Sequence, residues 1–498
     1  MIRRLDFILF SIFLLLTILA IFSNQYNNIY YVLFSILSIS LLRISFNKNS
    51  NYFEKFFGIF IFLGFWFKFS STLILNTVTN FFFRNYEITL RFLPELPENF
   101  IIKSEDINRT ILISCFAILI IIFNFMLRQK LFSNSFKLKK TNLNNLEIFY
   151  LNYRKYILLF LIFFIAALSF LNLNFFIYQK GIEPVLQTNF LILNLFKWLF
   201  QFGIASFVCL CIYYDLKNKI SLTTNVMLFV YQAFLLNLSF ISRSMLLECL
   251  VVFLILFFLG RHSKYKINFK KLIFILIFSV CLFFVNYKMV NNARDCLYTA
   301  NKVSGLKIKV FNCDQVLEQN LNNKEKSKSF IDTSKLILNM GIIRWVGFDA
   351  LVAVAKYPNL NLKVHLESFK EKYDKNIYSF YETKFLNKID RKEKNIIGDS
   401  NLVLLPGLVA FSYYSGSLIV MSLFITASIV LANLIEYISL RLTNFNLIFA
   451  GYLSFILSFR LVNFGHIPIN TIYYILVIIF NILLFFVINK LVKYATKR

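Results

Sequence analysis

Long apolar runs alternate with short polar segments along most of the chain. A helix needs about 20 apolar residues to cross the hydrocarbon core of a bilayer, with about 17 as a minimum. By this criterion the sequence predicts an all-α, polytopic membrane protein with twelve spans. The predicted spans cover residues 6–23, 28–45, 55–77, 109–127, 156–176, 192–214, 223–241, 244–260, 271–288, 416–437, 445–463 and 470–489.

One polar, charge-dense stretch interrupts this pattern at residues 286–405. Because so polar a segment must leave the bilayer, it predicts a large loop in contact with water. We therefore expect three parts: residues 1–285 with nine spans, the loop 286–405, and residues 406–498 with three spans.

The loop itself is expected to be partly helical. Residues 333–356 form an apolar stretch that polar residues interrupt and Pro358 ends. This pattern predicts a helix that lies along or dips into the membrane surface rather than crossing it. Residues 362–373 predict a second, shorter amphipathic helix, which carries His365 and Glu367.

The distribution of lysine and arginine predicts how the chain is oriented. Cations gather in every second short loop, for example at Arg3, Arg4 and residues 128–140. The positive-inside rule makes these loops cytoplasmic, so both termini are expected in the cytoplasm and the loop 286–405 on the opposite side. The many lysines of that loop do not conflict with this, because the bias weakens in loops longer than about 60 residues.

Composition supports the membrane class. Hydrophobic residues make up 58% of the 498 residues, and the formal net charge is +28. In a soluble protein this charge would suggest nucleic acid, but here most cations lie in short loops, which fits topology and anionic lipid better. We expect no nucleic-acid partner.

Cysteine usage predicts one disulfide and no metal site. Cys296 and Cys313 lie in the loop, in what would be an oxidising compartment, and a bridge between them would be worth about 3 kcal/mol in the entropic model. Two free thiols are the alternative. No metal-ligand spacing, phosphate-binding loop or dinucleotide turn is present, so we expect no metal and no cofactor.

Several ionisable residues lie inside spans or at their extracytoplasmic ends. Such a group costs at least about 2.5 kcal/mol within a span and is a functional candidate by default. Guanidinium binds phosphate oxygens bidentately and lysine supplies a point charge, so these residues predict a pyrophosphate-binding site. Its members are Lys68, Lys197, Arg243, Arg460 and His466 from the spans and their ends, and Arg294, Arg344 and His365 from the loop.

Most of these residues also have a structural alternative, which the sequence leaves open. The alternatives are an ion pair between Lys68 and Glu248, head-group contact for Lys197 and Arg460, capping of the hairpin 239–244 by Arg243, and a purely structural place for His365 and His466.

Five short patterns between the third and eleventh spans carry a resemblance to a known family. They are Gly64-Phe65-Trp66-Phe67-Lys68, Ile177-Tyr178-Gln179-Lys180-Gly181 with Lys197-Trp198, Ser242-Arg243-Ser244, Arg344-Trp345-Val346-Gly347, and Pro406-Gly407 with Tyr413-Tyr414-Ser415-Gly416. In these patterns and in its topology the chain resembles the O-antigen polymerases, the oligosaccharide repeat-unit polymerases of the Wzy type.

The resemblance implies an enzyme of lipopolysaccharide biosynthesis in the bacterial inner membrane. Such enzymes move a growing glycan from undecaprenyl pyrophosphate to a sugar hydroxyl of the next lipid-linked unit, at the periplasmic face. The glycosyl pyrophosphate is already activated, so no nucleotide or metal is required. Functional arginines are typical of the family, and this role carries over to Arg243, Arg294 and Arg344.

The remaining candidates complete this expected mechanism. A base near the acceptor hydroxyl is needed, and His365 is the first candidate, with Glu367 and Asp349 behind it. Lys68, Lys197, Arg460 and His466 would bind substrate. The expected partners are the lipid-linked oligosaccharide, membrane lipid, a chain-length regulator and a flippase.

Two other functions remain open. A transferase similar to the O-antigen ligases would perform nearly the same transfer onto a lipid A core. A flippase for lipid-linked oligosaccharides, which is not an enzyme, has a similar number of spans but has little use for so large an outer loop.

Overall fold

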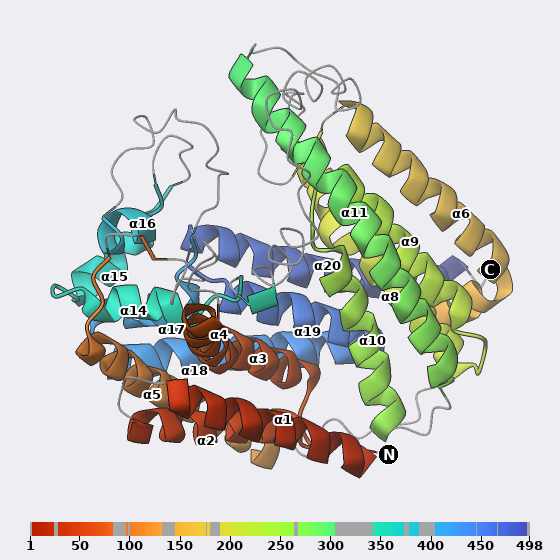
Figure 1. Ribbon diagram of the computed structural model, residues 1–498. Coiled ribbons are helices and arrows are strands. Elements are labelled where there is room, and N and C mark those ends of the chain that lie inside the picture. Colours follow the sequence, from red (N-terminus) through yellow and green to blue (C-terminus); the bar gives the residue numbers. More distant parts are fainter. Residues whose placement is uncertain are drawn as a thin grey trace. The chain divides into compact units, whose positions relative to one another are not determined.

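The computed structural model is all-helical in the part of the chain that it describes (Figure 1). The described residues are 2–23, 28–82, 96–97, 100–131, 145–175, 177–179, 190–262, 267–303, 341–342, 344–372, 378–387, 404–444, 446–465 and 467–495. Within these ranges the secondary structure consists of helices without any strand, which confirms the predicted all-α class.

Most helices match apolar runs of the sequence, and two of these runs contain a π-helical segment (η1 and η2). In the first half of the chain the helices are α1 (Ile2–Ser23), α2 (Asn28–Ser45), α3 (Tyr52–Phe62), η1 (Leu63–Phe67), α4 (Lys68–Phe82), α5 (Ser104–Leu131), α6 (Asn145–Phe175), α7 (Phe190–Trp198), η2 (Leu199–Gly203), α8 (Ile204–Lys217) and α9 (Thr223–Ser239). In the second half they are α10 (Met245–His262), α11 (Phe269–Val303), α14 (Phe348–Lys356), α15 (Leu362–Ser368), α16 (Phe380–Phe385), α17 (Gly407–Ser412), η4 (Tyr413–Ser415), α18 (Leu418–Leu442), α19 (Leu447–Val462) and α20 (Pro468–Ala495).

Eight helical stretches are long and apolar enough to cross a membrane, so the chain has the character of a polytopic membrane protein. The other four predicted spans also coincide with helices, namely α1, α9, α10 and α19, but the described apolar part of each is shorter. The total of twelve spans therefore stays a prediction. The eight stretches are Asn28–Ser45, Tyr52–Thr77, Ser104–Leu131, Asn145–Phe175, Leu193–Lys217, Phe269–Arg294, Leu418–Leu442 and Pro468–Tyr494.

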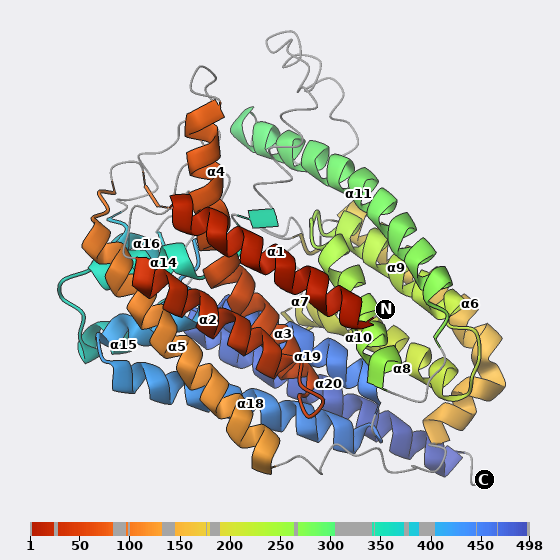
Figure 2. The same ribbon diagram turned by 60° about the horizontal axis from the view of Figure 1, so that its bottom comes forward.

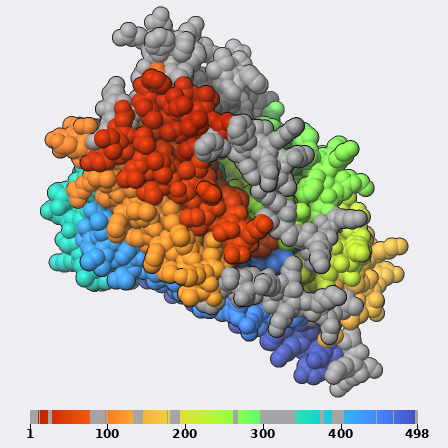
Figure 3. Space-filling view, turned by 90° about the horizontal axis from the view of Figure 1, so that it is seen from below, coloured from red at the N-terminus to blue at the C-terminus, as the bar shows by residue number. Residues whose placement is uncertain are grey.

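The chain forms two compact units that are interleaved in sequence. Unit 1 contains residues 1–137, 328–435 and 454–475, and unit 2 contains residues 138–327, 436–453 and 476–498. In unit 1, Figure 3 shows residues of α1 to α5 in red and orange on one face. Large apolar side chains of α5 such as Leu119, Phe123 and Met126 are about half exposed, as expected of a lipid-facing surface.

The first part of the predicted loop is helical. α11 continues through Val303, so residues 286–303 extend the helix that begins in the ninth predicted span. The reason is a packed face at helical spacing: Asn286 is buried and donates to the Phe234 carbonyl of α9 at 3.3 Å, and Val290 is buried against Ile241. Residues at this spacing pack on α9 and the turn that follows it, and amino-acid composition alone does not reveal such packing.

α14 is the described helix of the apolar stretch 333–356. Its residues from Phe348 to Ala355 are all buried, and the Phe348 ring packs on Phe34 and Phe69 of unit 1 with centroids 6.2 and 4.3 Å apart. A helix of nine residues is about 13 Å long, too short to cross a bilayer. α14 is thus packed inside the helix bundle of unit 1.

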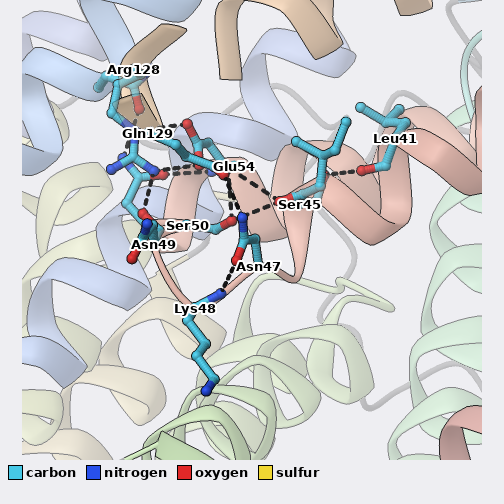
Figure 4. Close-up of polar contacts among 12 residues, drawn as sticks. Leu41, Ser45, Asn47, Lys48, Asn49, Ser50, Glu54, Arg128 and Gln129 are labelled. Carbon is cyan, nitrogen blue, oxygen red and sulfur yellow. Dashed lines mark hydrogen bonds and ion pairs between the residues drawn. The ribbon is translucent and has the colours of Figure 1, made fainter. Parts of the chain in front are cut away.

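A buried arginine–carboxylate cluster joins the α2–α3 turn to α5 in unit 1 (Figure 4). Glu54 is fully buried and accepts from Arg128 Nε at 2.8 Å, from Arg128 Nη2, and from Gln129 Nε2 at 3.1 Å. Arg128 also donates to the Asn49 carbonyl at 2.8 Å. Such a bidentate pair with further hydrogen bonds compensates for the loss of solvation on burial.

Unit 2 contains a cluster of the same kind. Asp215 of α8 is fully buried and accepts from Arg154 Nε and Nη2 of α6 at 2.9 and 2.7 Å. Tyr150 and Asn225 also donate to this carboxylate, at 3.1 and 2.6 Å. Arg128 and Arg154, two of the cations that predicted the orientation, therefore also hold helices together.

The close approach of η1 to the segment before α14 predicts a sharp effect of one substitution. Gly64 lies directly against the Val346 carbonyl, and a Cβ there would collide with it. Gly64→Ala should lower the free energy of unfolding by about 1–3 kcal/mol, because the clash is with backbone. Gly341→Ala is the matched control, since a Cβ there meets nothing within 4 Å. Equal thermal unfolding midpoints of the two variants in detergent would contradict the packing.

Candidate functional site

Lys68 is held in the interior of unit 1, where it joins α4 to α14. Its side chain is fully buried, with Nζ 3.3 Å from Asp349 Oδ2, and it donates to the Trp345 carbonyl at 2.9 Å. The π-helix η1 directly precedes Lys68, and π-helical turns are frequent at functional sites. Lys68 thereby attaches the start of α14 to a membrane-length helix.

The alternative pairing of Lys68 with Glu248, a residue of unit 2, stays a prediction. Glu248 lies in unit 2 and accepts from Asn237 Nδ2 and Ser244 Oγ, each at 3.0 Å. Asp349, one of the predicted bases, is buried beside Lys68 and balances its charge.

Arg344 begins a short strap, residues Arg344–Gly347, that crosses η1. The Val346 carbonyl lies directly against Gly64. A Cβ on Gly347 would lie 2.6 Å from the Gly64 carbonyl oxygen. Trp345 packs on Phe60 of α3, with ring centroids 6.0 Å apart. Arg344 itself is exposed, so the strap presents a guanidinium from a closely packed backbone.

Arg460 lies in the same unit, in a different environment. Its guanidinium carbon is 3.7 Å from the ring centroid of Tyr474 on α20, and its side chain is half-buried. The preceding residue, Phe459, packs on Phe60, which also contacts Trp345. Unit 1 thus joins Lys68 directly to the strap that carries Arg344, whereas the link to Arg460 runs through its neighbour Phe459 and through Phe60. The remaining candidate of this region, His466, lies outside the described residues.

His365 sits in an aromatic box formed in unit 1. Its ring stacks on Phe369 at 5.6 Å and packs on Phe411, Tyr414 and Phe424 at 5.1, 6.3 and 5.8 Å. The residue is 4% exposed, and Nδ1 makes no hydrogen bond within the described residues. Burial lowers the pKa of the imidazole below its ordinary value. This environment favours the structural alternative over general-base catalysis.

In unit 2, Arg294 holds the α9–α10 turn. Nε and Nη2 both donate to the Ile241 carbonyl, at 2.9 and 2.7 Å. Ile241 has φ +59°, an unfavourable conformation for a β-branched residue that persists only where its surroundings impose it. Arg294 supplies part of that constraint.

Two further predicted cations lie around this turn, each over a tyrosine ring. Arg243 is 5.9 Å from the Tyr287 ring centroid, and Lys197 is 5.6 Å from that of Tyr178. The Tyr178 ring packs in turn on Phe240, which immediately precedes Ile241. We call Lys197, Arg243 and Arg294 with these two tyrosines the turn cluster. The tyrosines were not predicted, although Tyr178 belongs to one of the patterns quoted above.

The predicted disulfide lies outside the described residues. The backbone of Cys296 is part of α11, but its side chain and the whole of Cys313 are not described. Across the described ranges, no group of three or more His, Cys, Asp or Glu side chains is arranged to hold a metal ion. What the described residues do offer is cations placed beside aromatic rings and in a fixed strap.

No protein-family model, curated protein or solved structure matches this chain, so the functional inference rests on its own residues.

The Lys68–Asp349 pair predicts a clear double-mutant result. Lys68→Met should cost about 3–5 kcal/mol of stability, since it leaves the carboxylate buried without its cation, and Asp349→Leu should cost a similar amount. The double variant should recover most of the loss, because neither charge then remains. Thermal unfolding in detergent measures this cycle. Additive losses in the double variant would show that the two side chains do not interact.

The aromatic box around His365 predicts a loss of stability in acid. Because the folded-state pKa is below that of the unfolded chain, the unfolded state binds more protons, and stability falls as pH drops below about 6.5. His365→Phe should fit the box and flatten this part of the profile. Unfolding midpoints measured from pH 7.5 downward test it. An unchanged acid-side loss in the variant would mean that His365 is not the group responsible.

Proposed function

We propose that the protein is a membrane glycosyltransferase that polymerises undecaprenyl-pyrophosphate-linked oligosaccharide units, in the manner of the Wzy-type polymerases it resembles. The observation that carries this proposal is the turn cluster, in which three separately predicted cations surround one turn. In unit 1, the strap separately presents Arg344 from a closely packed backbone.

The chemistry requires positive charge where the leaving group gathers negative charge. When the glycosidic bond to the diphosphate breaks, the two phosphates take up the electron pair, and preorganised cations lower the barrier. The same cations align the donor with the acceptor hydroxyl, which reduces the entropic part of the barrier. Cations beside membrane helices suit this role, because both substrates are tethered to lipid.

The way each cation is held distinguishes ligand binding from structural support. Lys68, Arg128 and Arg154 face buried carboxylates, which neutralise them. Lys197 and Arg460 lie over tyrosine rings, and neither forms an ion pair with a described carboxylate. A ring orients a cation but leaves its formal charge uncompensated, so it stays available to phosphate.

These differences assign roles within the proposed mechanism. Within unit 2, Arg243 and Arg294 would act on the pyrophosphate and Lys197 would help to bind it. Within unit 1, Arg344 stays a predicted catalytic cation and Arg460 a predicted binding residue, and Lys68 would position the strap. For the general base, the box around His365 leaves Glu367, which is half-buried on the same helix, as the better-placed candidate.

We place the protein in the bacterial inner membrane with both termini in the cytoplasm, so that the reaction occurs at the periplasmic face. A flippase would supply the lipid-linked units, and a chain-length regulator would be a further partner.

Reconstitution of the purified protein with a lipid-linked repeat unit tests the function. A ladder of elongated lipid-linked glycans is expected. Translocation without elongation would identify a flippase, and transfer of single units onto lipid A core without elongation would identify a ligase-like transferase. Either result would overturn the proposal.

Substitution of the arginines tests the site. Arg243→Ala and Arg344→Ala should each reduce polymer formation by about 100-fold or more, the effect typical of removing a group that stabilises the developing charge, while the protein remains in the membrane. Arg344→Lys should also be impaired, because an ammonium cannot replace a bidentate guanidinium.

Arg441→Ala is the matched control, since Arg441 is an exposed arginine at the end of α18 that is expected in the cytoplasm. Normal long-chain glycan from the Arg243 and Arg344 variants, or an equal loss in the control, would refute the site.

A further inference from the structure

Helix α15 has one buried face and one exposed face of mixed character. Val364, His365 and Ser368 point into unit 1 and are nearly inaccessible. On the other side, Leu362 and Leu366 are 55% and 57% exposed. These two residues are four positions apart and therefore lie on the same side of the helix. We call them the leucine pair.

α15 lies beside the start of a membrane-length helix of its own unit (Figure 2). The His365 ring is 5.8 Å from Phe424, which belongs to the second turn of α18. Leu360, just before α15, packs on Gly416, just before α18. On α18 itself, Ile419 and Leu423 are 72% and 66% exposed, as lipid-facing residues would be. α15 thus lies beside the N-terminal end of a helix that is long and apolar enough to cross a membrane.

Cations surround the exposed face of α15. Lys363, Lys370 and Lys372 are exposed, and none of them forms an ion pair with a described carboxylate. We call these three residues the lysine rim. Of the two nearby acids, Glu371 is turned inward and accepts from the backbone of Phe380 and Ile467 at 2.9 and 3.0 Å. Glu367 is half-buried, and the three lysines against these two acids leave a formal net charge of +1 on this segment.

We propose that α15 is a membrane-interface helix that recognises anionic phospholipid. The leucine pair inserts between lipid head groups at the N-terminal end of α18, and the lysine rim contacts the phosphate groups of these lipids. Apolar side chains flanked by lysine on a short amphipathic helix are the pattern of such contacts, and each lysine strengthens binding to an anionic surface by about fivefold. This contact would exist whatever reaction the protein performs.

The full-length protein in lipid nanodiscs allows a direct test. Leu366→Cys is labelled with an environment-sensitive NBD fluorophore, and the parent chain treated in the same way gives the background from native cysteines. In nanodiscs of phosphatidylcholine with phosphatidylglycerol we expect blue-shifted emission, quenching by nitroxide lipids and protection from aqueous iodide. In pure phosphatidylcholine these effects should be weaker.

Charge variants separate lipid recognition from mere proximity. Replacing the lysine rim by glutamine (K363Q/K370Q/K372Q) should abolish the difference between the two lipid compositions. The control K48Q/K130Q removes two exposed lysines elsewhere in unit 1 and should preserve it. Water-like emission with full iodide quenching would overturn the proposal, as would a phosphatidylglycerol effect that survives in the triple variant.

Discussion

A lysine inside a membrane-length apolar helix must find a counter-charge, and in this protein Lys68 finds Asp349. Neither side chain could be buried alone at tolerable cost, so the pair forms only if α14 enters the bundle of unit 1. Gly64 and Gly347 make room for that entry, because any side chain on either would collide with the backbone of the other segment. The exposed Arg344 owes its defined position to this one buried contact.

Each unit contains a buried arginine–carboxylate pair in a region that is expected to lie on the cytoplasmic side of the membrane. In unit 1 Arg128 donates hydrogen bonds to Glu54, and in unit 2 Arg154 donates hydrogen bonds to Asp215, each through two guanidinium nitrogens. A fork of two parallel hydrogen bonds fixes the orientation of two helices as well as their contact. Arginines that mark topology can therefore also set the packing of the helices that carry them.

Cations elsewhere are held by rings, turns and backbone carbonyls. Arg294 binds a carbonyl of a strained turn, and Lys197 and Arg460 lie over tyrosines. Side chains held in this way are oriented before a ligand arrives, which is what stabilisation of a developing diphosphate charge requires. The proposed transferase activity would rely on this kind of preorganisation.

The sequence by itself determined the helical class, the membrane character and most helix positions, because the length and period of apolar runs are local properties. It also identified Lys68, Arg243 and Arg294 as unusual, since a cation within or beyond an apolar run is visible without a structure. The partners of these residues were decided only by tertiary structure. Asp349 lies 281 positions after Lys68 in the chain, and the Ile241 carbonyl 53 positions before Arg294. The continuation of α11 past residue 286 and the burial of α14 have the same origin, because both depend on the face that a neighbouring helix presents, and no local pattern encodes that face.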